Sequence, residues 1–187
     1  QVGLSRWGFQ PPWMTAEYQR TAKRGPFINA RLETAHTARA FADATADHRC
    51  LVIADRLYDL KTEESGKRTP YFFDFDGEKL FFMAGIETAY PGPAWQAASS
   101  NFAILTHEAL SPVRDIHHRM PVMLDASQGI NWLNTGQVAN GDQVGSAALA
   151  ALGCRAVSTW INKREAEGPA CLHPPAEEQP PAQASLF

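Results

Sequence analysis

Cysteine is scarce in this 187-residue sequence. Its three cysteines, Cys50, Cys154 and Cys171, are an odd number, and no two lie at the close spacing of a zinc site. This argues against a disulfide-stapled secreted domain and favours a reducing cytoplasm. No apolar run approaches the roughly 18 residues that a membrane helix needs, and the first residues do not resemble a secretory signal. We therefore expect a cytoplasmic protein with no membrane span and no cofactor.

Excess charge of one sign is also missing. A net charge of −3 argues against a general polyanion binder. The distribution is uneven, however, because residues 1–39 hold six Lys or Arg against two acids, whereas residues 165–187 hold four acids and no Lys or Arg. The numbers are compatible with a local basic groove on a mildly acidic protein, and equally with ordinary scatter of surface charge.

The length and a hydrophobic content of 44% allow one domain with a real core. We expect an α+β domain over residues 1–173, built on a mostly antiparallel, strongly curved, barrel-like sheet with a few short helices. Residues 174–187 read as a Pro-rich tail. One strand is predicted to end at 7–9, and others are predicted to cover 50–53, 102–106, 121–124 and 155–160. Residues 71–75 and 80–86 are predicted to form a hairpin around Asp76-Gly77. Helices are predicted over 37–48, 125–133 and 142–151, capped by Thr37, Asp125 and Asp142.

His117 is the best catalytic candidate among single residues. It follows the polar segment 111–115 and precedes a predicted strand, and an imidazole can move protons near neutral pH. The alternative is a loop histidine that is hydrogen-bonded to the backbone. His118 and His107 lie nearby, but adjacent residues on a strand point to opposite faces. We therefore expect no metal site.

Two further polar groups lie on predicted strands. Strand alternation places Asp59 on one face with Leu57, where its carboxylate is a candidate proton donor or a solvated strand-end residue. Asn29 and Arg31 alternate in the same way and are expected to share a face with Glu33. An amide beside a guanidinium can hold a phosphate and a reacting amine, although a structural hydrogen-bond cluster has the same composition.

Aromatic residues flank the basic N-terminal segment. Trp13 and Tyr18 are candidates for stacking on bases of a single strand. Any hydrophobic core uses the same residues, and we expect Trp7 and Phe9 to lie in the core.

Taken in order, these segments resemble the SOS-response-associated peptidase (SRAP) family. The similarity runs from Trp7 to about Leu172, and the NARxET match at 29–34 is the most specific. The matching segments are Trp7-Gly8-Phe9 with Pro11 and Trp13, Asn29-Ala30-Arg31 with Glu33-Thr34, Arg49-Cys50-Leu51 with Ala54-Asp55, Pro70-Tyr71-Phe72, Met83-Ala84-Gly85-Ile86, Ile104-Leu105-Thr106, His117 with Arg119-Met120-Pro121-Val122, and Val157-Ser158 with Ile161-Asn162.

The resemblance implies a compact β-rich α+β domain that senses abasic sites in single-stranded DNA. In this family a cysteine exposed by removal of the initiator methionine attacks the ring-opened sugar, first through its α-amine and then through its thiol, which gives a thiazolidine cross-link. Matched residue by residue, Asn29 would orient the amine, His117 would act as acid and base, and Asp59 would occupy the position of the catalytic glutamate. The expected DNA contacts are Arg31, Arg39, Thr106, Arg119 and Trp13.

The sequence departs from the family pattern in several places. Gln1 is not an initiator residue, so we expect an upstream segment of a few dozen residues that carries the Met-Cys start. None of the three cysteines within the sequence can replace that nucleophile, because the chemistry needs an α-amine and a thiol on one residue. Asp59 replaces the glutamate of the family pattern. Arg56 replaces a glycine, Leu60 a tryptophan and His118 an aspartate, and Met14 stands where some relatives have a DNA-contacting tryptophan.

Three functions therefore stay open. The first is a cytoplasmic, nucleoid-associated monomer that cross-links to abasic sites in single-stranded DNA and removes its own initiator methionine. The second is a weakened or inactive relative that only binds single-stranded DNA. The third is a protease acting on other proteins, for which no nucleophile–base pair stands out in the sequence.

Overall fold

The computed structural model describes residues 2–23, 25–75, 80–89, 100–138, 149 and 151–175. Its strands are β1 (Ser5–Trp7), β2 (Asn29–Arg31), β3 (Arg49–Ala54), β4 (Arg56–Thr62), β5 (Arg68–Phe75), β6 (Phe81–Ala89), β7 (Ser100–Glu108), β8 (Arg119–Pro121), β9 (Met123–Leu124) and β10 (Leu152–Ala156). Its helices are α1 (Ala16–Ala22), α2 (Leu32–Ala35), α3 (Ala42–Asp47) and α4 (Ala126–Thr135), with short 3-10 helices η1 (Val113–Asp115), η2 (Thr159–Asn162) and η3 (Pro169–Leu172).

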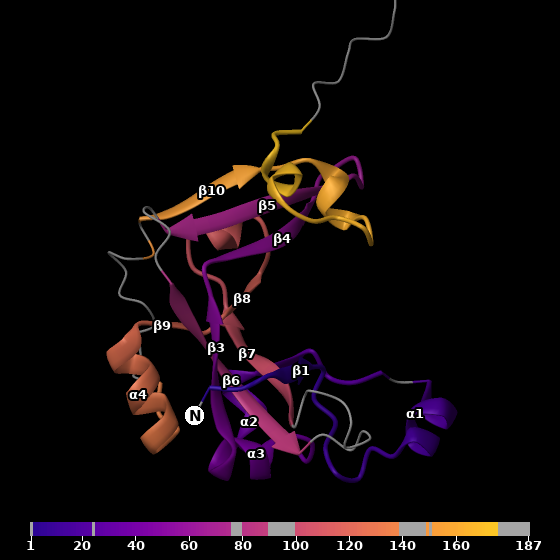
Figure 1. Ribbon diagram of the computed structural model, residues 1–187, viewed down its shortest axis with the longest axis vertical. Coiled ribbons are helices and arrows are strands. Elements are labelled where there is room, and N and C mark those ends of the chain that lie inside the picture. Colours follow the sequence, from indigo (N-terminus) through magenta and orange to yellow (C-terminus); the bar gives the residue numbers. More distant parts are fainter. Residues whose placement is uncertain are drawn as a thin grey trace, which may run out of the picture.

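The strands form two sheets. A seven-stranded sheet runs β1-β7-β6-β3, with β2 and β8 also paired to β7 and β9 paired to β6, and a three-stranded antiparallel sheet runs β10-β5-β4. All pairs are antiparallel except those of β1 and β2 with β7. Figure 1 shows the three-stranded sheet at one end of the molecule and α2 and α3 at the other. The prediction of an α+β fold on mostly antiparallel, curved sheets is confirmed, and the larger sheet is curved but not closed into a barrel.

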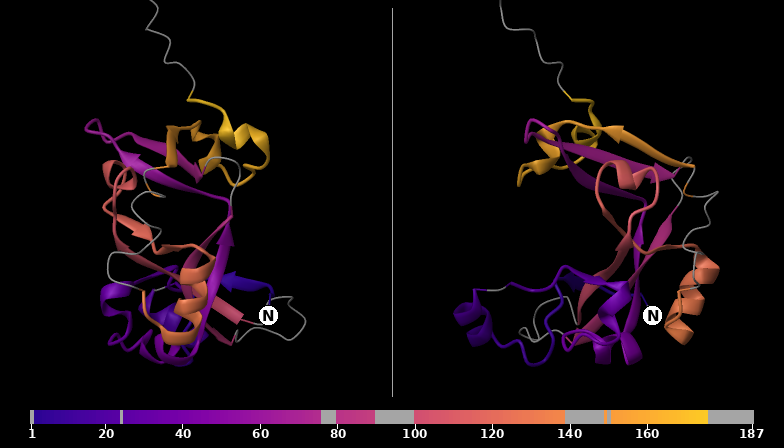
Figure 2. Two further views of the ribbon diagram at one scale, coloured as in Figure 1. Left: turned by 90° about the vertical axis from the view of Figure 1, so that its left-hand side faces the viewer. Right: turned by 180° about the vertical axis from the view of Figure 1, so that it is seen from behind.

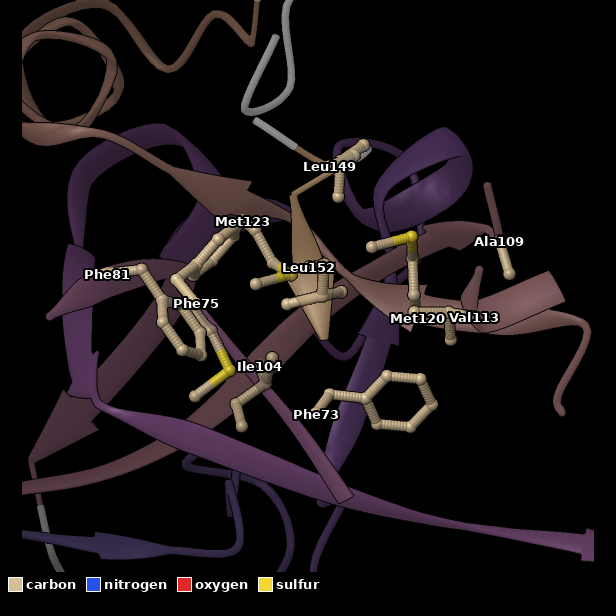
Figure 3. Close-up of a cluster of buried hydrophobic side chains, with 11 residues drawn as sticks. Phe73, Phe75, Phe81, Ile104, Ala109, Val113, Met120, Met123, Leu149 and Leu152 are labelled. Carbon is tan, nitrogen blue, oxygen red and sulfur yellow. The ribbon is translucent and has the colours of Figure 1, made fainter. Parts of the chain in front are cut away.

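Two hydrophobic clusters lie on opposite faces of the larger sheet. The cluster between the sheets joins Phe73 and Phe75 of β5 to Phe81 of β6 and to Met120 of β8 (Figure 3). Burial of these side chains holds the two sheets together. The cluster on the other face lies beneath the helices, and Ala35 of α2, Ala44 of α3 and Trp132 of α4 belong to it. Figure 2 shows α4 and α1 on opposite sides of the molecule.

The predicted hairpin of 71–75 and 80–86 is wrong. Both segments are strands, but β5 pairs with β4 and β10, whereas β6 pairs with β3, β7 and β9. The chain passes from one sheet to the other between them, and residues 76–79 lie outside the described residues. Alternation and a turn dipeptide identify strand ends, but they carry no information on which strands become partners.

Three other local predictions also need correction. Thr37 caps no helix: its hydroxyl donates to the Thr34 carbonyl at 3.2 Å, and of the helix predicted at 37–48 only the part at 42–47 forms, as α3. The last strand is β10, and 159–162 form a 3-10 helix. Trp7 is 55% exposed, with its indole N–H donating to the Ile28 carbonyl at 2.8 Å, whereas Phe9 is buried as expected.

The strands predicted at 50–53, 102–106 and 121–124 are confirmed, as is the helix that Asp125 caps. Apart from residues 149 and 151, the helix predicted at 142–151 lies outside the described residues, as do most of the predicted tail and residue 1. The domain boundary at 173 stays a prediction. Among the described helices, none is both long and apolar enough to cross a membrane.

Candidate functional site

His117 and Asp59 come together from different sheets. His117 lies between η1 and β8, on the side of the larger sheet, and Asp59 belongs to β4 of the smaller one. The Asp59 Oδ2 atom lies 3.5 Å from His117 Nδ1, and the Asp59 Oδ1 atom accepts from the Leu60 backbone N–H at 2.7 Å. Both side chains are partly exposed, at 40% for His117 and 29% for Asp59. The pair is therefore open to a ligand and able to exchange protons with it.

The surroundings of His117 define its tautomer when the ring is neutral. Nδ1 lies 3.0 Å from the Arg119 carbonyl oxygen as well as near the Asp59 carboxylate, and both groups only accept hydrogen bonds. The Arg119 backbone N–H also faces Nδ1, but at the longer distance of 3.4 Å. The two acceptors favour a proton on Nδ1, which leaves the lone pair on Nε2 free to act as a base.

His118 takes an unexpected position. Its ring contacts the His117 ring, with centroids 4.5 Å apart, although adjacent residues on a strand would point to opposite faces. Both residues precede the first residue of β8, so strand alternation does not apply to them. No group of three or more potential metal ligands gathers anywhere in the described part of the chain.

Arg119 and Glu33 form a bidentate ion pair. Arg119 Nη1 donates to Glu33 Oε1 at 2.8 Å, and Nη2 donates to Glu33 Oε2 at 2.9 Å. Nη2 also donates to the Thr106 carbonyl. The hydrogen bonds from Arg119 hold the pKa of Glu33 at about 2, below its usual 4.5. Glu33 lies in α2, so it does not continue the strand face of Asn29 and Arg31 as the sequence predicted.

The predicted DNA-contacting residues fall into two groups. Arg31 of β2 pairs in register with Thr106 of β7, and Thr106 also pairs with Pro121 of β8. The Arg119 side chain contacts Thr106, so Arg31, Thr106 and Arg119 are neighbours. Arg31 is exposed, as is Asn29 two residues earlier, whereas Thr106 is only 8% exposed. Asn29 makes no side-chain hydrogen bond within the described residues, and none joins it to Asp59 or His117.

Trp13 and Arg39 form the second group. The Arg39 guanidinium lies over the Trp13 ring at 5.3 Å, and Tyr18 meets the same ring edge-on at 5.3 Å. Trp13 is half-buried, while Arg39 and Tyr18 are exposed. Trp13, Tyr18 and Arg39 thus form one contiguous cluster.

Cys50 and Cys154 offer no activated thiol. Cys50 is half-buried beside Glu87, and burial raises the pKa of its thiol to about 12. Burial also raises the pKa of Cys154. A thiolate is the reactive form of cysteine, so neither thiol is prepared for nucleophilic attack.

A pocket that the sequence did not reveal lies on β4, β5 and η2. It has a volume of about 280 Å³ and is lined by Tyr58, Asp59, Leu60, Pro70, Ile161 and Asn162. Tyr58 and Leu60 alternate with Asp59 along β4, so they line it from the face opposite the Asp59–His117 contact. Only the packing of η2 on the sheet creates this space, which no local pattern could have shown.

Several known proteins are similar to this chain. The family model for SOS response associated peptidase (SRAP) matches residues 1–164. The abasic site processing protein YoaM of Bacillus subtilis is 33% identical over 139 residues, which cover 72% of this chain and 57% of that protein. The abasic site processing protein HMCES of Pongo abelii is 26% identical over 201 residues, which cover 92% and 56%.

A solved structure of a protein from Bacteroides thetaiotaomicron has the same fold. Its TM-score is 0.70 at 22% identity, over 91% of this chain and 75% of that one. The chain therefore belongs to the SRAP family. It spans a little over half of the length of the curated relatives it matches.

Proposed function

We propose that this protein binds single-stranded DNA at abasic sites and forms a covalent cross-link to the sugar. Its relatives are abasic site processing proteins, and the His117–Asp59 pair supplies the acid–base group that such chemistry needs. The nucleophile in this proposal is a cysteine that follows the initiator methionine and precedes Gln1. The protein removes that methionine itself.

Two bond-forming steps make up the proposed reaction. The α-amine adds to the sugar aldehyde, and loss of water gives a Schiff base. The thiol then adds across the C=N bond, so that a C–S bond forms and the thiol proton passes to nitrogen, which closes the thiazolidine. His117 Nε2 takes a proton from the attacking amine and delivers one to the departing hydroxyl. Asp59 balances the charge on the imidazolium, and Asn29 orients the amine.

DNA is held in this proposal by exposed cations and an aromatic side chain. Arg31 and Arg39 contact phosphates, and Trp13, beneath Arg39, contributes an aromatic surface. Arg119 and Thr106 have few free polar atoms, because Glu33 and neighbouring backbone already use most of them. We assign these two to shaping the surface beside Arg31. The protein acts as a monomer in the cytoplasm, associated with the nucleoid.

The second candidate is a relative that binds DNA without efficient cross-linking. One observation favours it: the Asp59 carboxylate is 3.5 Å from His117 Nδ1, beyond the roughly 3.2 Å limit of a good N–H···O hydrogen bond. A protease acting on other proteins has less support, because burial raises the thiol pKa values of Cys50 and Cys154 and so disfavours their nucleophilic thiolate forms.

The decisive experiment uses the protein with its natural N-terminus and a single-stranded oligonucleotide that carries one abasic site. A band that stays shifted on a denaturing gel, and that is lost when the first residue after methionine is changed from Cys to Ser, is the expected result. An undamaged oligonucleotide of the same sequence is the control. A shift on a native gel alone would support the binding-only candidate and overturn the cross-linking proposal.

A further inference from the structure

Arg119 links two parts of the site through its two ends. Its side chain is tied to Glu33 of α2 by two hydrogen bonds of 2.8 and 2.9 Å. Its backbone carbonyl lies 3.0 Å from His117 Nδ1. The position of one residue therefore sets both an ion pair and the orientation of the candidate catalytic imidazole.

The strand that carries Arg119 is short, and two backbone hydrogen bonds hold the chain just before it: Ala109 N–H donates to the His118 carbonyl at 3.0 Å, and His117 N–H donates to the Val113 carbonyl at 2.9 Å. β8 is three residues long, and Arg119 is its first residue, paired with Glu108, the last residue of β7. The ends of short strands open easily because few hydrogen bonds must break. The side-chain tie to Glu33 adds to these few backbone bonds in fixing where the Arg119 carbonyl lies.

The guanidinium of Arg119 is committed within the protein. Besides Glu33, it donates to the Thr106 carbonyl and lies 3.4 Å from the Thr106 hydroxyl. Its side chain is 18% exposed, and Nε is buried with no hydrogen-bond partner among the described residues. A guanidinium engaged in this way has few donors left for a DNA phosphate.

We infer that Glu33 is a positioning residue for His117. By holding the Arg119 side chain, Glu33 fixes the Arg119 carbonyl that accepts from His117 Nδ1–H, and so presents the Nε2 lone pair to the reacting atoms. The catalytic part of this inference rests on the proposed function, whereas the control of the tautomer does not. The low pKa of Glu33, about 2, agrees with a carboxylate that stays ionised in this role.

The first test reads the His117 tautomer directly by long-range ¹H–¹⁵N NMR, without DNA, at a pH where the ring is neutral. In the wild-type protein we expect the Nδ1–H form. Glu33→Gln should shift it toward a mixture with the Nε2–H form, because the amide cannot replace both acceptor contacts. Glu64→Gln, at an exposed glutamate in the turn between β4 and β5, is the matched control and should leave the spectrum unchanged. An unchanged tautomer in Glu33→Gln overturns the inference.

The second test separates rate from binding in the protein with its natural N-terminus. Glu33→Gln should slow cross-linking at saturating DNA by about tenfold, as expected for a small displacement of a catalytic group, while the Kd for DNA changes less than about twofold. Arg119→Lys should behave in the same way, because lysine cannot form the bidentate pair. Glu33→Asp, which keeps the charge, should recover part of the rate and replaces Glu33→Gln if that variant does not fold.

Opposite results have distinct meanings. A change in Kd with an unchanged rate would overturn the inference and return Arg119 to phosphate binding. If the wild-type protein does not cross-link at all, the proposed function fails, and the NMR experiment still decides whether Glu33 positions His117.

Discussion

At the level of single residues, the length of the Asp59 side chain governs its contact with His117. Its Oδ2 atom lies 3.5 Å from Nδ1, while Oδ1 is held by the Leu60 backbone N–H at 2.7 Å. A glutamate at this position would extend the carboxylate by roughly 1.5 Å, one carbon–carbon bond. That is enough to bring the carboxylate oxygen into hydrogen-bonding distance of the imidazole.

We therefore predict that Asp59→Glu speeds cross-linking by up to about tenfold, because a stronger hydrogen bond stabilises the imidazolium and fixes the ring. His117→Ala should slow cross-linking by about a hundredfold, the usual contribution of general acid–base catalysis. Single-turnover rates at saturating abasic-site DNA provide the measurement.

Asp55→Glu is the control for this pair of variants. Asp55 lies four residues earlier and pairs with Arg56, so its lengthening should not affect the rate. The assignment of His117 and Asp59 would be wrong if neither His117→Ala nor Asp59→Glu changed the rate.

At the level of elements, local signals worked where a side chain caps its own helix. The Asp125 side chain accepts from the Gln128 backbone N–H at 2.8 Å, and the Gln128 side-chain oxygen accepts from the Asp125 backbone N–H at 2.9 Å. This capping box starts α4 where the sequence predicted. The helix predicted from Thr37 begins only at Ala42, as α3, because nonlocal packing decides where it starts. The Phe41 ring, at the N-cap position of α3, packs against Phe9 and Phe27.

The ion pair between Glu33 and Arg119 ties α2 to β8, and its contribution to stability should depend on pH. The folded-state pKa of Glu33, about 2, lies below the ordinary value of 4.5. The stabilisation is therefore present in full above pH 4.5 and is lost as the pH falls toward 2. Since half of the Glu33 side chain is exposed, solvent screening limits the contribution of the ion pair to about 1 kcal/mol or less. That energy corresponds to a change in Tm of at most about 2–4 °C.

Thermal unfolding of wild type and Glu33→Gln from pH 7 down to pH 2 tests this expectation. The difference in Tm should be largest above pH 4.5 and close to zero at pH 2, whereas Glu64→Gln should follow the wild type throughout. An equal difference at both ends of the range would mean that the ion pair does not carry the stability.

At the level of the whole molecule, the distance between Asp59 and His117 depends on how the two sheets pack. Asp59 belongs to the three-stranded sheet, and His117 precedes a strand of the seven-stranded sheet. Between the sheets lies the cluster in Figure 3, with the fully buried Phe73 of β5 among its members. Val113 of this cluster accepts a hydrogen bond from the His117 N–H at 2.9 Å, so packing in the cluster contributes to the geometry of the site.

Phe73→Leu should consequently slow cross-linking at saturating DNA by several-fold, because a shift of about 1 Å between catalytic groups is costly. The matched control is Phe9→Leu, at a side chain buried to the same degree in the cluster beneath the helices. Both variants should lose about 1–2 kcal/mol in urea unfolding, but only Phe73→Leu should lose rate. Equal cross-linking rates in the two variants would show that packing between the sheets does not control the geometry of the site.

Short-range patterns were sufficient for most strands, for the capped helix α4 and for the family, because alternation, caps and motifs involve residues close together in the chain. They were not sufficient for the partners of β5 and β6, the exposure of Trp7 or the ion pair of Glu33 with Arg119, whose residues are 86 positions apart. Strand partners are selected by burial of whole faces, and distant side chains meet only after the sheets have packed. The site between the sheets is a product of that packing.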